Sequence, residues 1–261
     1  MKRSLKVALI LSACFIVIGF LLVAVSLRFF PWNTVRVEEQ REITVTEIQE
    51  PFTALHLDIV EADIRFEFGA TAKIAYRNFD HVVYASEVRD GVLDLYRVDE
   101  RTTVEKLFDF TRKNQEIVIT LPAEAYQSLW LRTVSGDIAL TGNLKIAETT
   151  IESTSGDITM AGLEGDALSI LTTSGDLELH RVVLTKKMNL ESTSGDIEAE
   201  ACNAPEILID TTSGDVEATW LTEKKFMIDT VSGEREVPPS AETTETCTVK
   251  TVSGDIEISA K

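Results

Sequence analysis

The sequence predicts an all-β protein: a parallel β-solenoid of about 19–21-residue coils, preceded by one transmembrane helix. Three observations support this fold class. A short phrase recurs at a nearly constant spacing, apolar residues alternate on both sides of each copy, and one long uncharged segment stands near the N-terminus.

The repeated phrase is Ser-Gly-Asp. Its seven copies read VSGDI, TSGDI, TSGDL, TSGDI, TSGDV, VSGER and VSGDI, with serines at Ser135, Ser155, Ser174, Ser194, Ser213, Ser232 and Ser253. A period of about 20 residues is typical of a solenoid that stacks one small unit. A catalytic site needs one constellation of different groups at one point, so a motif in seven copies does not predict one.

Apolar residues flank each phrase with period two, which is typical of strands with one buried face. Four residues before the serine stand Leu131, Ile151, Ile170, Leu190, Ile209, Ile228 and Val249. Three residues after it stand Ile138, Ile158, Leu177, Ile197, Val216 and Ile256. A Thr or Ser two residues before each serine continues the inward face.

The Thr or Ser and the next inward residue are separated by an odd number of positions, from two before the serine to three after it. In a straight strand, the apolar residues after the phrase would therefore point to the opposite face from those before it. The chain must therefore bulge or turn a corner at the phrase. We predict structural turns at Gly136, Gly156, Gly175, Gly195, Gly214, Gly233 and Gly254, because glycine adopts positive φ without steric cost. The neighbouring Asp is expected to bond its own backbone.

Residues 1–32 are predicted to form a cytoplasmic tip and a transmembrane anchor. The opening MKRSLK carries three cations, and the uncharged stretch 7–27 that follows can cross a ~30 Å hydrocarbon core at ~1.5 Å per residue. Basic residues before the span favour a cytoplasmic N-terminus. We therefore expect a single-pass protein of the cytoplasmic membrane with its C-terminal domain outside. An alternative is that Leu11-Ser12-Ala13-Cys14 is a lipobox and Cys14 is lipidated.

The remaining chain divides into three predicted regions. Residues 33–51 form a polar tether, residues 52–130 form irregular opening β-coils, and residues 131–261 form the regular solenoid. Residues 99–115 are charged and aperiodic, so we expect a protruding loop.

The sixth repeat departs from the pattern. Arg235 occupies an inward position, and Pro238-Pro239 cannot donate to a strand ladder, so Pro238 to Thr246 should leave the solenoid as a loop. If each coil pairs with the next along the chain, the seventh repeat ends the stack. Its exposed edge at Ile256-Glu257-Ile258 would then be open to a partner or another copy.

The chain is acidic, with a formal net charge of −18, which argues against binding to nucleic acid or anionic lipid. Two acidic columns should share an outward face, and the possible cation stripe comprises Asp176, Glu178, Asp196, Glu198, Asp215, Glu217, Asp255 and Glu257. Such a stripe suits a divalent cation such as Ca²⁺, or the docking of a basic surface. Calcium prefers six to eight oxygens, and the phrase lacks the extra glycines of the calcium-binding β-roll repeat. The alternative is a solvated face, and no cofactor is expected.

The cysteines and histidines do not indicate catalysis. Cys202 and Cys247 should lie ~9 Å or more apart, beyond disulfide reach. His56, His81 and His180 are scattered and are interpreted as surface or strand residues. No catalytic or metal site is therefore assigned.

The chain resembles the bacterial putative-adhesin family of toastrack-like proteins, which includes LiaG-like membrane proteins. The resemblance covers about 52–261 and rests on the basic and apolar N-terminus, Leu55-His56-Leu57-Asp58, Ile119-Thr120-Leu121-Pro122 and the Thr-x-Ser-Gly-Asp series. It implies a β-solenoid of the cell envelope, often membrane-tethered and encoded with envelope-stress regulators. It supplies no catalytic residues.

These observations predict a non-enzymatic interaction or scaffold module of the envelope, with a protein partner and a possible part in stress sensing. A surface adhesin is the second hypothesis. A polysaccharide-acting β-helix enzyme is the third, and it would need paired carboxylates in a groove with unequal environments. The oligomeric state is left open.

Overall fold

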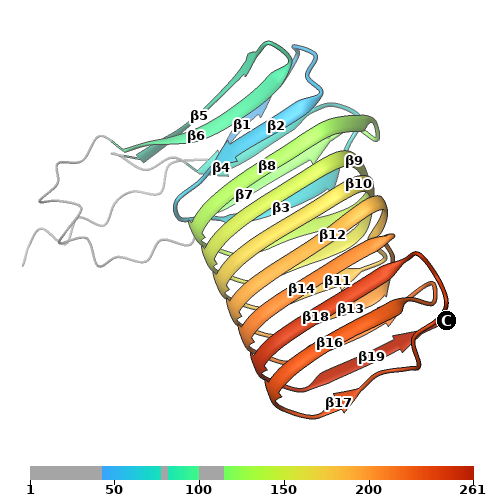
Figure 1. The fold of residues 1–261 in the computed structure, drawn as a ribbon. Helices are drawn as coiled ribbons and strands as arrows, with labels where there is room; N and C mark the ends of the chain where they lie inside the picture. The colour runs from blue at the N-terminus through green and yellow to red at the C-terminus, as the bar shows by residue number, and fades with distance from the viewer. Residues whose placement is uncertain (1–42, 78–81, 100–114) are drawn as a thin grey trace, which may run out of the picture. The chain divides into compact units, whose positions relative to one another are not determined.

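A computed structural model describes residues 43–77, 82–99 and 115–261, which form an all-β, largely parallel solenoid (Figure 1). They belong to one unit, Gln40–Lys261. The predicted anchor at 1–32 and most of the predicted loop at 99–115 lie outside the described residues. Within the described ranges, no helix has the length and apolarity needed to span a membrane.

Within these ranges, nineteen strands form one continuous sheet with two faces, joined at the Ser-Gly-Asp corners. In spatial order, the first face comprises β5 (Val82–Arg89), β6 (Val92–Asp99), β2 (Ala54–Asp58), β8 (Ala125–Ser135), the second halves of β9 (Ile138–Ser155) and β10 (Ile158–Ser174), β12 (Val183–Ser194), β14 (Glu206–Ser213), β18 (Thr246–Ser253) and β16 (Lys225–Ser232). The second face comprises β1 (Ile43–Glu47), β4 (Lys73–Arg77), β7 (Glu116–Leu121), β3 (Asp63–Phe68), the first halves of β9 and β10, β11 (Leu177–His180), β13 (Ile197–Cys202), β15 (Val216–Trp220), β19 (Ile256–Ala260) and β17 (Arg235–Glu236). Among the strands of the described residues, only β5–β6, β1–β4 and β4–β7 pair antiparallel.

Alternate residues of both faces fill one apolar core. Leu190 before a phrase and Leu177 after another are both 0% exposed, as the period-two pattern predicts. The hydroxyl residues two positions before the phrase are also buried in six of the seven repeats, the exception being Thr230 in the sixth. The apolar side chains before and after each phrase therefore both point into the core, and the chain turns a corner at the phrase, as predicted.

The corner requires glycine for two reasons. All seven phrase glycines have φ between 116° and 154°, a region that other residues rarely adopt. Coils also approach closely there, because a Cβ on Gly156 would lie 2.2 Å from the carbonyl oxygen of Gly136. Any side chain would push two coils apart.

The phrase aspartates bond from coil to coil, which the expectation of a local turn did not include. The backbone N–H of the residue after each phrase glycine donates to Oδ1 of the equivalent aspartate in the neighbouring coil of the stack. The N···O distances are 2.7–3.0 Å. This aspartate ladder runs Asp63, Asp137, Asp157, Asp176, Asp196, Asp215, Asp255 and Glu234. The phrase thus satisfies a backbone donor that a parallel ladder would leave free at a corner.

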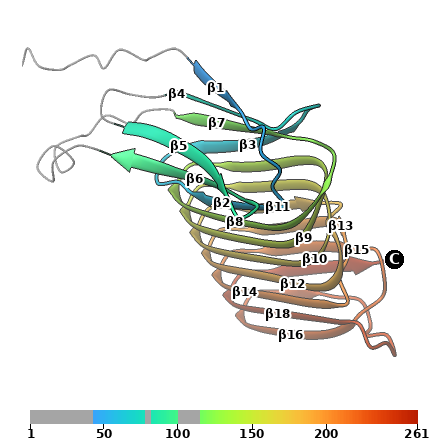
Figure 2. The ribbon, with the colours of Figure 1, turned by 90° about the horizontal axis from the view of Figure 1, so that it is seen from above.

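The order of coils corrects the expectation that the stack follows the chain. The seventh repeat lies between the fifth and the sixth, because β18 pairs with both β14 and β16, and β19 pairs with both β15 and β17. The first coil is inserted in the same way, since β2 lies between β6 and β8, and β3 lies between β7 and β9. Figures 1 and 2 show β16 at one end of the stack and β1 and β5 at the other.

The sixth repeat is therefore the end coil, and its defect has a physical reason. Arg235 stands at an inward position but is exposed, since no further coil covers it. The loop 237–245 leaves the solenoid, close to the predicted span 238–246, and covers part of the edge, but Thr246 already belongs to β18. The hydroxyl of Ser240 accepts from Phe226 N (3.0 Å) and lies 3.3 Å from Phe226 O, and Ala241 N donates to Lys224 O (3.0 Å).

The predicted tether contains a strand. The alternating β-branched residues of β1 pair antiparallel with β4, from Ile43 opposite Arg77 to Glu47 opposite Lys73. Ile43 is 60% and Val45 57% exposed, as expected at an edge. The solenoid therefore begins within residues 33–51 and not after them.

Candidate functional site

The predicted cation stripe is a straight column of carboxylates on the second face. Five glutamates lie in register on adjacent strands: Glu178, Glu198, Glu217, Glu257 and Glu236. They are exposed, and neighbours at ~4.8 Å repel by about 0.9 kcal/mol in water. Nearer the N-terminal end, Thr159 and Ala139 occupy the same positions, so the column covers only the C-terminal half of the stack.

The phrase aspartates of the stripe flank this column, but one oxygen of each is already used. Oδ1 of Asp176, Asp196 and Asp215 accepts the backbone N–H of the adjacent coil. Across residues 43–77, 82–99 and 115–261, no three His, Cys, Asp or Glu side chains converge closely enough to hold a metal ion.

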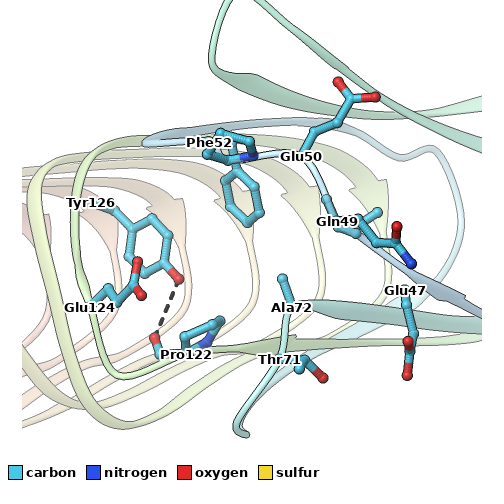
Figure 3. Close-up of a pocket in the computed structure, with 11 residues that line it drawn as sticks. Glu47, Gln49, Glu50, Phe52, Thr71, Ala72, Pro122, Glu124 and Tyr126 are labelled. Carbon is cyan, nitrogen blue, oxygen red and sulfur yellow. Dashed lines mark hydrogen bonds between the residues drawn. The ribbon is translucent and has the colours of Figure 1, made fainter.

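A cavity of about 540 Å³ opens at the N-terminal end, among the loops at 48–52, 71–72 and 122–126 (Figure 3). Phe52 and Tyr126 form a stacked wall, with ring centroids 5.8 Å apart. Three carboxylates also line it, from Glu47, Glu50 and Glu124. An aromatic wall beside carboxylates suits a cationic guest.

Two interactions set the polarity of this cavity. The Tyr126 hydroxyl donates to Pro122 O at 3.3 Å, and burial, together with the charge of Glu124, raises the pKa of Tyr126 to about 12. Tyr126 is therefore a neutral donor at physiological pH. Glu47 is paired with Lys73 at 2.9 Å. No motif in the sequence points to this cavity, because most of its lining residues lie in segments between strands, outside the Ser-Gly-Asp repeats.

The described histidines lie on strands, as interpreted. His56 Nδ1 is 2.7 Å from Asp94 Oδ1, and His180 Nδ1 is 3.0 Å from Glu200 Oε2, in register on neighbouring strands. His81 lies outside the described residues. The two pairs are on opposite faces of the solenoid, so they do not share a site.

An aromatic and charged cluster stands on the outer first face near the N-terminal end. The rings of His56 and Trp130 are 4.5 Å apart, and the Arg132 guanidinium lies 5.6 Å from the Trp130 ring centre. Arg132 also donates twice to Asp58, at 2.7 and 3.1 Å. In the next coil Thr150 and Glu152 occupy the positions of Trp130 and Arg132, so the cluster does not continue along the stack.

Both cysteines of the solenoid are buried free thiols. Burial raises the pKa of Cys202 to about 11 and that of Cys247 to about 12. Both therefore remain protonated thiols at neutral pH, and reactive thiolate chemistry is suppressed.

The turn between β15 and β16 holds a buried polar cluster that the sequence reading missed. Lys224 is 0% exposed, and its Nζ donates to Asn203, Ala204 and Thr222 and contacts Glu245. In the sequence it is one half of an ordinary Lys-Lys pair, which gives no sign of burial.

Comparisons with solved structures found several similar chains. A crystal structure of a putative adhesin from Bacteroides fragilis aligns at 17% identity, covering 85% of this chain and 98% of that one, with a TM-score of 0.47. A putative adhesin from Parabacteroides distasonis aligns at 12% identity, covering 82% of this chain and 97% of that one, with a TM-score of 0.46. A putative cell adhesion protein from Clostridium sporogenes aligns at 13% identity, covering 85% and 100%, with a TM-score of 0.36.

No curated protein matches the chain. The family model described as Toastrack DUF4097 matches residues 52–261, which is most of the chain. The protein therefore belongs to the Toastrack DUF4097 family.

Proposed function

We propose that this protein is a membrane-anchored, extracytoplasmic scaffold of the bacterial cell envelope that binds a protein partner and catalyses no reaction. The anchor and the orientation are inferred from the basic residues and the uncharged stretch within 1–32.

The observation that carries the proposal is the repetition of surface chemistry along the stack. The aspartate ladder and the glutamate column present the same groups on successive coils at the inter-strand spacing of ~4.8 Å. Such a surface suits an extended partner that contacts many coils, whereas a reaction requires different groups converging on one point. A basic partner segment is the natural complement of the glutamate column.

Site-specific photocrosslinking in intact cells tests the proposal. A photoreactive residue is placed in the full-length chain at Glu217 on the glutamate column, at Leu171 on the outer first face, or at Ser240 on the end loop. Leu171 is 51% exposed and lies between Glu152 and Glu191 on the other face, so it samples an exposed position away from the glutamate column. Crosslinked proteins are then identified by mass spectrometry.

We expect position 217 to capture a membrane or envelope protein that positions 171 and 240 do not. Capture of only foreign surface components would favour adhesion instead. Equal capture from all three positions, or none from any, would contradict a specific scaffold surface.

A further inference from the structure

The turn between β15 and β16 encloses Lys224 because it connects two coils that are not neighbours in the stack. The inserted seventh repeat lies between them. At its start the turn rests directly on the turn below, where Leu221 N donates to Cys202 O at 3.1 Å. At its end the inserted coil intervenes, and Lys225 N donates to Glu245 O at 2.8 Å. The side chain of Lys224 fills the gap that opens between the two turns, and it is 0% exposed.

Four oxygens surround the buried amine. Lys224 Nζ lies 2.7 Å from Asn203 Oδ1, 2.8 Å from Thr222 Oγ1 and 2.9 Å from Ala204 O, and it also contacts Glu245 Oε2. The Thr222 hydroxyl is 2.9 Å from Asn203 Oδ1 and 2.7 Å from Glu245 Oε2. An amine, a carboxamide, a carboxylate and a hydroxyl therefore meet at one point.

These groups have complementary chemical roles. A lysine amine shielded from water is a nucleophile once it loses a proton, and a carboxylate in contact with it can accept that proton. Once Glu245 has taken up a proton, the single proton of the Thr222 hydroxyl is free to donate to the carboxamide oxygen of Asn203, which polarises the carbonyl for attack. Fixing the amine against the carboxamide removes the entropy cost of bringing them together.

We propose that Lys224 and Asn203 form an intramolecular isopeptide bond, with Glu245 as the acid–base catalyst. Glu245 accepts a proton from the Lys224 ammonium, and the freed lone pair attacks Cγ of Asn203 after the carboxamide turns to face it. A bond forms between Nζ and Cγ, and the bond between Cγ and Nδ2 breaks.

The step balances without an added reactant. Nζ loses two protons, Glu245 passes both to the departing nitrogen, and that nitrogen leaves as an ammonium ion. Glu245 returns to its carboxylate form, and no group is oxidised or reduced. The product joins the turn after β13 to the turn before β16, and so locks the inserted coil β18 in place.

Peptide mass mapping of the full-length protein tests the bond directly. A protease that cleaves after glutamate cuts at Glu217, between the two linked residues. We expect the peptide containing Asn203 and the peptide containing Lys224 to remain joined, with a combined mass lower by one ammonia. Recovery of the two peptides separately at their sequence masses would overturn the proposal, and this result requires no variant.

Matched variants separate the proposed bond from other losses of ammonia. Lys224→Met keeps the length of the side chain but removes the amine, and Glu245→Gln keeps its shape but removes the base. Both should abolish the joined peptides, whereas Lys225→Met at the exposed neighbouring position should retain them. An ammonia loss at Asn203 that persists in Lys224→Met would identify a succinimide formed with the backbone and would also overturn the proposal.

Discussion

The middle of the solenoid and its two ends are built from the same repeat but follow different rules. From β9 to β15 each coil stacks on the one before it in chain order, with every phrase in register. At the C-terminal end the seventh repeat is inserted between the fifth and the sixth, and at the N-terminal end β2 and β3 lie inside β6 and β7, which follow them in the chain.

The difference teaches what a repeat specifies. The phrase sets the shape of a coil and the register of its contacts, but every coil offers the same two surfaces, so the phrase alone does not set which coil lies next to which. The end coils must also face water on one side. The sixth repeat meets that need with Arg235, Glu234 and the loop 237–245, which would all be unsuitable inside the stack.

The largest expected contrast between the middle and the end lies in the core. Leu190 in the middle is 0% exposed, whereas Ile228 in the end coil is only partly buried. We expect Leu190→Ala to lower the free energy of unfolding by about 2–5 kcal/mol, since it removes transfer energy and leaves a cavity. Ile228→Ala should cost less than half as much in the same denaturant titration. Equal losses would show that the end coil is packed as tightly as the middle.

The corner glycines give the next contrast. Gly175→Ala would place Cβ 2.2 Å from Gly156 O between two fixed coils, at a φ of 117°. We expect a loss of about 1–3 kcal/mol from backbone strain, measured by thermal unfolding. Gly233→Ala creates a similar clash with Gly254 O at 2.0 Å, but the end coil can move away. A larger loss of stability for Gly233→Ala than for Gly175→Ala would contradict the expectation that the end coil moves to relieve the clash.

The two buried thiols predict how alkali acts on the middle and on the inserted coil. The folded pKa values, about 11 for Cys202 and about 12 for Cys247, exceed the ordinary value of 9.0. The contribution of the two thiols to the free energy of unfolding is therefore complete below pH 9.0. It is lost as the pH rises through the pKa values of the folded state, because the unfolded chain releases these protons first.

Urea titrations between pH 8 and 11 measure this effect. The decline above about pH 9 should flatten partly in Cys202→Ala, in the middle, and partly in Cys247→Ala, in the inserted coil. An unchanged slope in both variants would show that other groups govern the alkaline limit.

The smallest expected effect concerns the aspartate ladder. Asp196→Ala removes the acceptor for Asp215 N, and we expect a loss of about 1 kcal/mol. Asp196→Asn keeps an oxygen acceptor and removes one of several repelling charges, so its stability at low salt should equal or exceed that of the wild type. If Asn were as harmful as Ala, the charge and not the hydrogen bond would be the stabilising feature.

Much of the fold follows from local pattern. The parallel coils, the inward columns, the corner glycines and the loop after Pro238-Pro239 can all be inferred from residues within about 20 positions of each other. The order of the end coils cannot, because Ser232 and Ser253 lie in repeats that present equivalent edges to Ser213. The burial of Lys224 follows from that order, so it could not be predicted from the sequence either. The coil-to-coil bonds of the aspartates were missed because Asp beside Gly also suits a local turn.

Disulfide trapping tests the inserted coil most directly. Asp210, Lys250 and Asp229 occupy equivalent outward positions on β14, β18 and β16. Adjacent strands lie ~4.8 Å apart and alternate ones ~9.6 Å, while a disulfide needs Cα atoms within about 7 Å. Paired cysteines at 210 and 250, and at 229 and 250, should crosslink within one chain on mild oxidation, whereas a pair at 210 and 229 should not. Crosslinking at 210 and 229 without crosslinking at 210 and 250 would show that the coils stack in chain order and would contradict the insertion.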